Sequence, residues 1–347
     1  MDVPFFVWAL TIAVIVGMLL FDFVGHVRTP HAPTLRESAI WSAVYVGIAL
    51  VFGLLILWFA GADFAGEYFA GYVTEKSLSV DNLFVFVLIM ASFGVPRQLQ
   101  QKVLLFGITF ALALRTVFIL IGAAAIENFS WVFYVFGAIL LYTAWVQARS
   151  GGHSGEEDYR ENAVLRFTRK VLPTTEQYHS DRMTVTVGGK RFITPLAIAL
   201  VAIGTADVIF AVDSIPAIFG LTQETYLVFA ANAFSLLGLR QLFFLIDGLL
   251  DRLVYLAYGL AVILGFIGAK LVIHALHTNE LPFLNGGEHV TAIPEIPTSL
   301  SLVVILATLL ITTLASLAKS RRDRTRAGAT PAANSDAAQP VSPHASH

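Results

Sequence analysis

The sequence contains no cysteine. Disulfide bonds, thiolate metal sites and thiol redox chemistry are therefore excluded for this chain. Any metal ion must be bound by oxygen or imidazole ligands.

Charged residues are also scarce. They make up 13% of the 347 residues, and hydrophobic residues make up 56%, whereas soluble proteins have about 25% charged and 45–50% apolar residues. Several apolar runs approach the length of about 20 residues that crosses a bilayer as a helix. They cover residues 5–25, 38–60, 72–93, 103–125, 129–148, 195–219, 225–246, 253–274 and 299–317. The composition predicts an all-α polytopic membrane protein with about nine transmembrane helices in the lipid bilayer.

The first apolar run differs from a signal peptide. No basic segment precedes it, it is longer than a signal-peptide core, and no small-residue cleavage site follows it. We expect it to remain in the protein as a helix.

Basic residues occur in alternate loops. The loops at 26–37, 94–102, 149–194 and 247–252 contain Lys or Arg, and the loops between them contain neither. Basic loops lie on the cytoplasmic side of a membrane. The pattern predicts that the N-terminus is outside and the C-terminus inside, as an odd number of spans requires.

The two halves of the chain share a motif. Residues Glu75–Asn82 read EKSLSVDN and Asp207–Ser214 read DVIFAVDS, so each copy places two acids six residues apart. Downstream, LRTVFILIG from Leu114 matches LRQLFFLID from Leu239. Each copy spans three helices, so the second enters the membrane in the opposite orientation. This 3+3 inverted-topology repeat is a common transporter architecture.

The repeat and the loops together divide the chain into segments. These are two first helices (1–71), repeat 1 (72–148), a cytoplasmic loop (149–194), repeat 2 (195–274), an outer loop (275–298), a last helix (299–318) and a basic, then disordered, cytoplasmic tail (319–347). In the cytoplasmic loop, a Val-Thr alternation at 184–187 before two glycines indicates a hairpin, and we expect a small helix beside it. The outer loop is rich in His and Glu, which favours a solvated loop that could gather cations loosely.

Each motif places carboxylates and small polar groups on a helix. Residues seven apart share a helix face, which pairs Glu75 with Asn82 and Asp207 with Ser214. The second acids of the motifs, Asp81 and Asp213, lie on another face.

Pro216 follows Asp213 by three residues. It has no N–H to donate and frees the carbonyl of Val212. We therefore expect a broken helix here, which can offer backbone oxygen to a cation.

Charged residues inside membrane spans are costly and are read as functional. We expect Arg115 and Arg240, at matching places in the two repeats, to pair with the acids, with Lys76 nearer a helix end. Four acids against two arginines leave two negative charges, or one if Lys76 also points inward. This excess favours a cation site over a set of purely structural ion pairs.

The donor types narrow the cation further. Carboxylate, amide, hydroxyl and carbonyl oxygens suit magnesium, calcium and manganese better than copper or zinc. Asp22 is either a further ligand or proton carrier, or a solvated residue near its helix end. Asp247 and Asp251 are interpreted as surface charges.

The motif EKSLSVDNLFVF from Glu75, DVIFAVDSIPAIFG from Asp207 and LLGLRQLFFL from Leu236 resemble the TerC/Alx family of bacterial integral membrane proteins. The resemblance covers residues 36–318. The family is similar to the LysE-type exporters, and its members are associated with manganese export, tellurite (tellurium) resistance and metal supply to exported enzymes. The resemblance implies a multi-pass protein of the bacterial inner membrane.

The resemblance also assigns residues. Asp81 and Asp213 would be the central metal-binding acids, with Glu75, Asn82, Asp207 and Ser214 around them. The chain departs from the family pattern at Gly204, where an acidic residue is common.

The resulting hypothesis is a manganese exporter with a carboxylate site between the repeats, driven by protons entering from outside. Calcium or an organic cation is an alternative cargo, and a non-transporting membrane-protein or envelope assembly factor is an alternative function. An enzyme is not expected, because no nucleophile–base constellation or phosphate-binding glycine loop occurs, and no nucleic-acid partner is expected.

Overall fold

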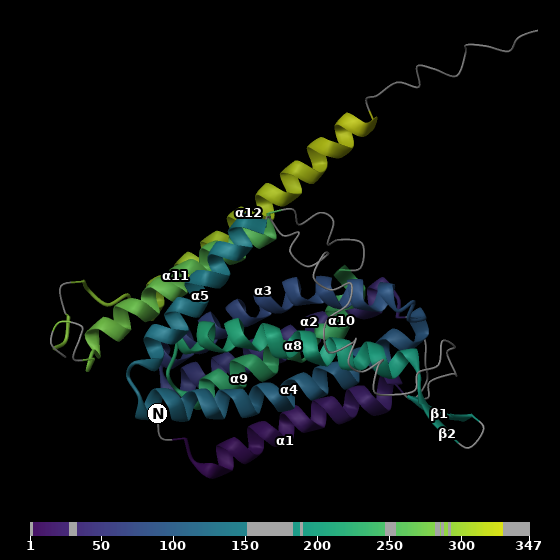
Figure 1. The fold of residues 1–347 in the computed structure, drawn as a ribbon, viewed down its shortest axis with the longest axis horizontal. Helices are drawn as coiled ribbons and strands as arrows, with labels where there is room; N and C mark the ends of the chain where they lie inside the picture. Colours follow the sequence, from purple (N-terminus) through teal and green to yellow (C-terminus); the bar gives the residue numbers. More distant parts are fainter. Residues whose placement is uncertain are drawn as a thin grey trace, which may run out of the picture.

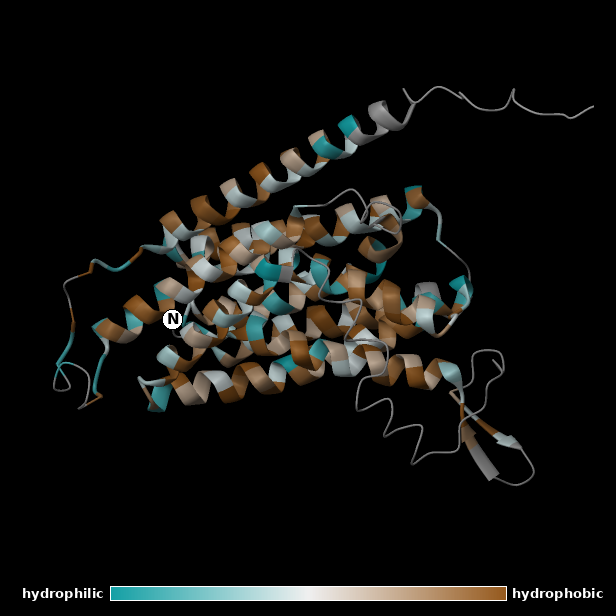
Figure 2. Cartoon of the chain, turned by 45° about the horizontal axis from the view of Figure 1, so that its top comes forward, coloured by the Kyte–Doolittle hydropathy of each residue, from teal (hydrophilic) through white to brown (hydrophobic). Residues whose placement is uncertain are grey.

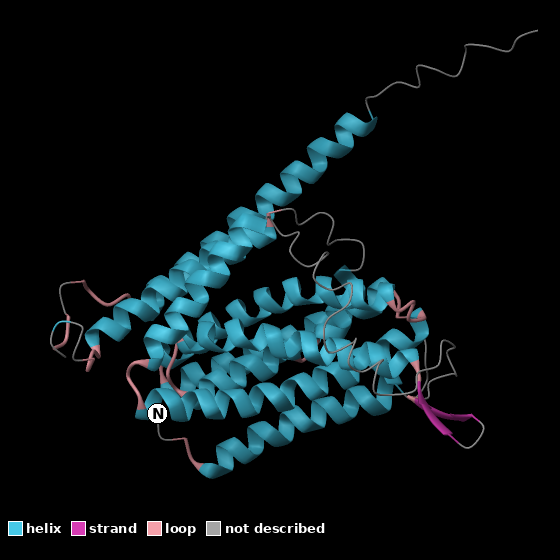
Figure 3. Cartoon of the chain, viewed as in Figure 1, coloured by secondary structure: helices cyan, strands magenta, loops and turns pink. Residues whose placement is uncertain are grey.

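The protein is described by a computed structural model in which almost every placed residue is helical (Figure 3). The structure describes residues 3–27, 33–150, 183–187, 190–246, 255–281, 285, 288–290 and 293–328. Its helices are α1 (Phe5–Asp22), followed by the π-helical turn Phe23–Val27, α2 (Leu35–Ala60), α3 (Ala62–Ser92), α4 (Arg97–Asn128), α5 (Val132–Ser150), α8 (Pro195–Phe219), α9 (Thr225–Leu236), α10 (Leu239–Ile246), α11 (Leu256–His277) and α12 (Thr298–Gly328).

The expected all-α polytopic membrane fold is confirmed. Within the described residues, eight stretches of helix are long and apolar enough to cross a membrane, α9 and α10 counting together as Thr225–Leu245. The ninth predicted span, in α3, does not meet that standard because Glu75, Lys76 and Asp81 lie within it. Helix α3, which is too charged to count as a span by this standard, is therefore the helix that carries the first acidic motif.

The helices are mostly hydrophobic (Figure 2), and many of their large apolar side chains are exposed, as lipid contact requires. Phe5 of α1 is 86% exposed, and Trp58 and Phe59 at the end of α2 are 85% and 83% exposed. In water such surfaces would be an aggregation hazard. In a bilayer, lipid chains contact these side chains.

The helices form two groups (Figure 1). One group contains α1 to α4 and α8 to α10, and the other contains α5, α11 and α12, which are inclined to the first. Glycines let α5 and α11 approach closely: a Cβ on Gly137 would lie 2.7 Å from Val272, and one on Gly268 would lie 3.1 Å from Leu140. Small residues at such contacts are typical of membrane helix pairs.

The contacts between the two repeats follow a regular pattern. The first helix of repeat 1 packs on the second of repeat 2 (α3 on α9), and the second of repeat 1 packs on the first of repeat 2 (α4 on α8). The third helices, α5 and α11, pack on each other. Exchanging the repeats leaves this pattern unchanged, as a two-fold relation would. The inverted repeat and the membrane orientation remain predictions.

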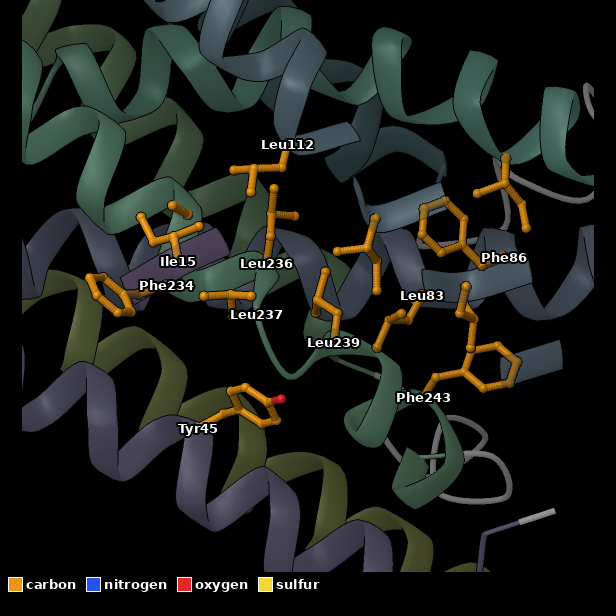
Figure 4. Packing of buried hydrophobic residues seen from close by; sticks show 14 of the residues in the cluster. Ile15, Tyr45, Leu83, Phe86, Leu112, Phe234, Leu236, Leu237, Leu239 and Phe243 are labelled. Carbon is orange, nitrogen blue, oxygen red and sulfur yellow. The ribbon is translucent and has the colours of Figure 1, made fainter. Parts of the chain in front are cut away.

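The predicted helix break at Pro216 is wrong. Helix α8 runs through Pro216 to Phe219, because the surrounding α4, α5 and α3 hold the segment in place. A break occurs instead between α9 and α10, where Leu237 is extended and Gly238 has a φ of +82°. Leu237 and its neighbours still pack in the core, facing Tyr45 of α2 (Figure 4).

The hairpin expected in the cytoplasmic loop is present. Strand β1 (Thr184–Val187) pairs antiparallel with β2 (Lys190–Ile193), and Thr184 lies opposite Ile193. The helix expected in the same loop, and the tail from 329 onward, lie outside the described residues.

The break between α9 and α10 generates a prediction about Gly238. An alanine there would adopt an unfavourable positive φ, and its Cβ would lie 2.8 Å from the Cβ of Tyr45. We expect Gly238→Ala to lower the free energy of unfolding by about 1–3 kcal/mol, measured by thermal unfolding in detergent. The control is Gly47→Ala in α2, whose Cβ would have no neighbour within 4 Å and which should not destabilise. Equal stability of the two variants would contradict the assignment.

Candidate cation site

A buried guanidinium connects the two acidic motifs. Arg115 of α4 donates from Nε to Asp207 Oδ2 at 3.1 Å and from Nη2 to Asp207 Oδ1 at 2.9 Å. Its Nη1 donates to Glu75 Oε1. Arg115 and Glu75 are 0% exposed and Asp207 is 3% exposed. One planar cation therefore holds one carboxylate from each repeat, and the bidentate half of the contact is the strong geometry for such pairs.

The second acids of the two motifs have no such partner. Asp81 accepts a hydrogen bond from Gln147 Nε2 of α5 at 2.9 Å. Asp213 interacts electrostatically with Arg115 and with Asp81. Among the described residues, no Lys, Arg or His forms a salt bridge with Asp81 or Asp213. These two carboxylates are the ones left to bind a cation.

Sequence reasoning missed Gln147. It lies in the predicted span 129–148, and a polar amide near the end of an apolar run resembles an interfacial residue. Only the close packing of α5 against the rest of the bundle brings its amide to Asp81. The one available signal was that Gln147 is a polar residue inside an apolar stretch.

The prediction for Arg240 is wrong, because the structure places this arginine elsewhere. Its Nη2 donates to Asp22 Oδ1 of α1 at 3.0 Å, and its Nη1 donates to Gln101 at 3.0 Å. The hydroxyl of Tyr45 donates to the same Asp22 oxygen at 2.6 Å. The break before α10 re-aims Arg240 toward α1, so matching sequence positions do not give matching contacts.

Asp22 is therefore neither solvated nor part of the acid cluster. It is 3% exposed and also accepts a hydrogen bond from Gln241 at 3.3 Å. This second buried ion pair joins α1, α2, α4 and α10.

Lys76 points inward rather than toward a membrane surface. Its ammonium donates to the carbonyl of Ser235 at 2.9 Å, in the last turn of α9. Helix C-termini carry partial negative charge and exposed carbonyls, which a cation stabilises. Lys76 thus supports the end of α9 at the break.

The charge balance of the site follows from these contacts. The four acids are Glu75, Asp81, Asp207 and Asp213. Arg115 pairs with Glu75 and Asp207 and interacts electrostatically with Asp213, while Lys76, next to Glu75 in the sequence, binds the Ser235 carbonyl. Four negative charges and two positive charges leave two negative charges. The excess expected from the sequence is retained, with Lys76 in place of Arg240.

The other predicted ligands differ in how deeply they are buried. Ser214 is 1% exposed and its hydroxyl has no hydrogen-bond partner, whereas Asn82 is half-buried. The side chain of Val212 is 55% exposed and faces away from the core. Asp247 and Asp251 lie outside the described residues.

Carboxylates and imidazoles alone do not complete a metal site here. Within the described part of the chain, no three His, Asp or Glu side chains gather closely enough to hold a metal ion. A cation near Asp81 and Asp213 therefore needs further oxygen ligands from amides, hydroxyls, the backbone or water.

Gly204 leaves little free space for a side chain. A Cβ at this position would lie 3.1 Å from Cδ1 and from Cε1 of the Phe110 ring. Because Phe110 is 53% exposed, its ring could shift by the few tenths of an ångström that a larger residue at Gly204 would require.

Two histidines in the last turn of α11 hold the outer loop in place. His274 Nδ1 contacts Glu295 at 3.1 Å, and the His277 ring contacts the carbonyl of Ile293 at 2.5 Å. These contacts fasten the loop to the end of α11.

Comparison with known proteins identifies relatives over most of the chain. The family model described as "Integral membrane protein TerC family" matches residues 60–324. "Uncharacterized membrane protein Rv2723" of Mycobacterium tuberculosis is 56% identical over 317 residues, which cover 91% of this chain and 80% of that protein.

Two further relatives are more distant. "Putative membrane-bound redox modulator Alx" of Escherichia coli is 39% identical over 275 residues, covering 77% of this chain and 85% of that protein. A membrane protein of Myxococcus xanthus, STKORF319, is 37% identical over 317 residues, covering 90% of this chain and 92% of that protein. No solved structure matches the chain.

The central ion triad generates a stability prediction. Arg115→Met should lower the free energy of unfolding by about 3–5 kcal/mol, because it leaves two buried carboxylates uncompensated. The triple variant that adds Glu75→Gln and Asp207→Asn should recover much of the loss. The measurement is thermal or chemical unfolding in detergent, with the exposed Arg36→Met in α2 as a control that stays within about 0.5 kcal/mol of the native protein. An Arg115→Met protein as stable as the native one would show that the triad is not a structural tie.

Proposed function

The chain belongs to the TerC family of integral membrane proteins, and from this premise we propose that it exports a divalent metal ion, manganese, across the cell membrane. The ion is bound between the two repeats by Asp81 and Asp213. It enters from the predicted cytoplasmic side and leaves on the outer side.

The observation that carries this proposal is the unbalanced charge in the core. Among the described residues, Asp81 and Asp213 form no salt bridge, and the formal charges of the four acids exceed those of Arg115 and Lys76 by two. Buried carboxylates that lack a partner are expensive inside a membrane. One divalent cation balances that excess.

The donor set supports manganese, calcium or magnesium as the class of cargo. Carboxylates, the Gln147 amide and the Ser214 hydroxyl are hard oxygen ligands. The described imidazoles at 274, 277 and 289 lie in or beside the outer loop, away from Asp81 and Asp213. The preference for manganese over calcium comes from the family resemblance.

The fixed and free acids have different roles in the mechanism. Arg115 holds Glu75 and Asp207 in place, so these carboxylates position the pathway. Protons arriving from outside would neutralise Asp81 and Asp213 and weaken their hold on the ion. Release is thereby coupled to proton entry, and Gln147 keeps Asp81 oriented between cycles.

The name of the Escherichia coli relative, Alx, refers to redox modulation. The present chain has no cysteine, so it has no thiol with which to carry electrons or form disulfides. Control of a redox-active metal ion such as manganese needs no such group. The proposal for this chain is therefore transport, with no catalytic residue.

The free acids are tested directly by transport. In proteoliposomes, Asp81→Asn and Asp213→Asn should lower the initial rate of manganese flux by more than about 100-fold, because even outer partners of metal ligands cost 10–100-fold. The matched control is Asp63→Asn, the same change at an exposed position of α3, which should transport at the native rate. Reversing the imposed pH gradient should reverse the effect of protons on flux. Native flux in both core variants, or no flux of manganese, calcium or magnesium by the native protein, would overturn the proposal.

Gln147 provides a second test, which depends on a contact seen only in the structure. Gln147→Leu removes the hydrogen bond to Asp81 and should weaken manganese affinity by about 10–100-fold while the maximal rate falls less. The half-saturating manganese concentration measures this effect. Gln98→Leu, at an exposed position of α4, is the control. An unchanged half-saturating concentration in Gln147→Leu would mean that Asp81 does not need this orientation.

A further inference from the structure

Three helices of the core carry buried polar side-chain atoms without hydrogen-bond partners. Glu75 Oε2 and Thr74 Oγ1 come from α3, Ser214 Oγ comes from α8, and Ser235 Oγ and both amide atoms of Asn232 come from α9. All five residues are at most 1% exposed. Proteins nearly always satisfy buried polar atoms, and a group of exceptions calls for an explanation.

The contacts of Gly71 show where these three helices meet. A Cβ on Gly71 of α3 would lie 3.3 Å from the Cβ of Ala231 on α9 and 3.4 Å from Cγ2 of Ile218 on α8. The three helices therefore touch at one level of the bundle.

Helices α3 and α9 run in the same direction. Gly71 contacts Ala231, and further along both helices the Lys76 ammonium reaches the Ser235 carbonyl. Five residues along α3 therefore correspond to four residues along α9.

Helix α8 runs opposite to α3. Gly107 and Gly122 of α4 contact Ile203 and Phe219 of α8, respectively, so α4 and α8 are parallel. Because α4 returns antiparallel to α3 after a short turn (Figure 1), α8 is antiparallel to α3.

These directions bring the unpartnered atoms to one level. One turn from the Gly71 contact, each helix presents a residue on the same face: Glu75 on α3, Ser235 on α9 and Ser214 on α8. Asn232 lies three residues before Ser235, on a neighbouring part of the same face of α9. This register places a carboxylate oxygen, two hydroxyls and an amide at one level of the bundle, where helices of the two repeats pack together.

We propose that Asn232, Ser235, Ser214 and the free oxygen of Glu75 form a second cation position, on the outer side of Asp81, through which the ion passes on its way out. This inference rests on the proposed function and adds α9 residues that the acidic motifs do not contain. It supplies the neutral oxygen ligands that the carboxylates alone lack.

The charge around this position permits a cation. Arg115 occupies Glu75 Oε1 and leaves Oε2 unpartnered. Arg115 and Lys76 themselves contact residues of this position, Glu75 and Ser235, so they offset part of the negative excess of the four acids where the ion would sit. A position built mostly from neutral oxygens binds a divalent ion less tightly than a carboxylate pair, as suits a step that precedes release.

Asn232→Leu tests the proposal. The variant replaces an unpartnered buried amide by an apolar side chain of similar size, so its unfolding temperature without metal should equal or exceed that of the native protein. Two quantities are measured: the rise in unfolding temperature on adding manganese chloride in detergent, and manganese flux in proteoliposomes. We expect Asn232→Leu to lose most of the rise and about tenfold or more of the flux. Asn128→Leu, at an exposed position of α4, is the control and should match the native protein in both.

Two further variants keep the test decisive. Asn232→Asp retains an oxygen ligand and should retain the manganese-dependent rise. Ser214→Ala/Ser235→Ala, a smaller change, should reduce it, and stands in if Asn232→Leu fails to fold. A native rise and native flux in both Asn232→Leu and the serine double variant would overturn the second position while Asp81→Asn still abolishes transport. If the native protein itself shows neither a rise nor flux with manganese, calcium or magnesium, the exporter proposal fails instead.

Discussion

The core of the protein depends on one guanidinium. Arg115 holds Glu75 from the first repeat and Asp207 from the second at a point with no access to solvent. In a low-dielectric interior an unpaired carboxylate is costly, so both acids depend on this guanidinium. Because Arg115 lies on α4, the contact also ties α4 to α3 and α8, the two helices that carry the acidic motifs.

Satisfying two acids with one arginine leaves the other two available. Asp81 has only a neutral amide from Gln147, and Asp213 has no salt bridge among the described residues. Under the transport proposal, structural and ion-binding roles are thus divided among four carboxylates by whether they pair with Arg115. A second arginine in the core would neutralise the charge that the proposed ion must balance.

The break between α9 and α10 keeps Arg240 out of the acid cluster. With Leu237 extended and Gly238 at a positive φ, the chain turns Arg240 away from the acids and toward Asp22. The last turn of α9 is then open to Lys76, whose charge stabilises the exposed carbonyls.

The sequence by itself determined that the chain is a polytopic membrane protein, how many spans it has apart from the charged α3, the acidic motifs and the family. Each of these depends on local composition and residue spacing. The sequence also indicated the hairpin at 184–193, since a two-residue glycine turn is a local signal. The tertiary structure alone decided which cation meets which acid. A proline usually interrupts a helix, yet packing keeps α8 continuous through Pro216. Arg115 and Arg240 occupy matching sequence positions, yet a change in backbone direction before Arg240 sends them to different partners, because a contact between helices depends on the path of the whole chain.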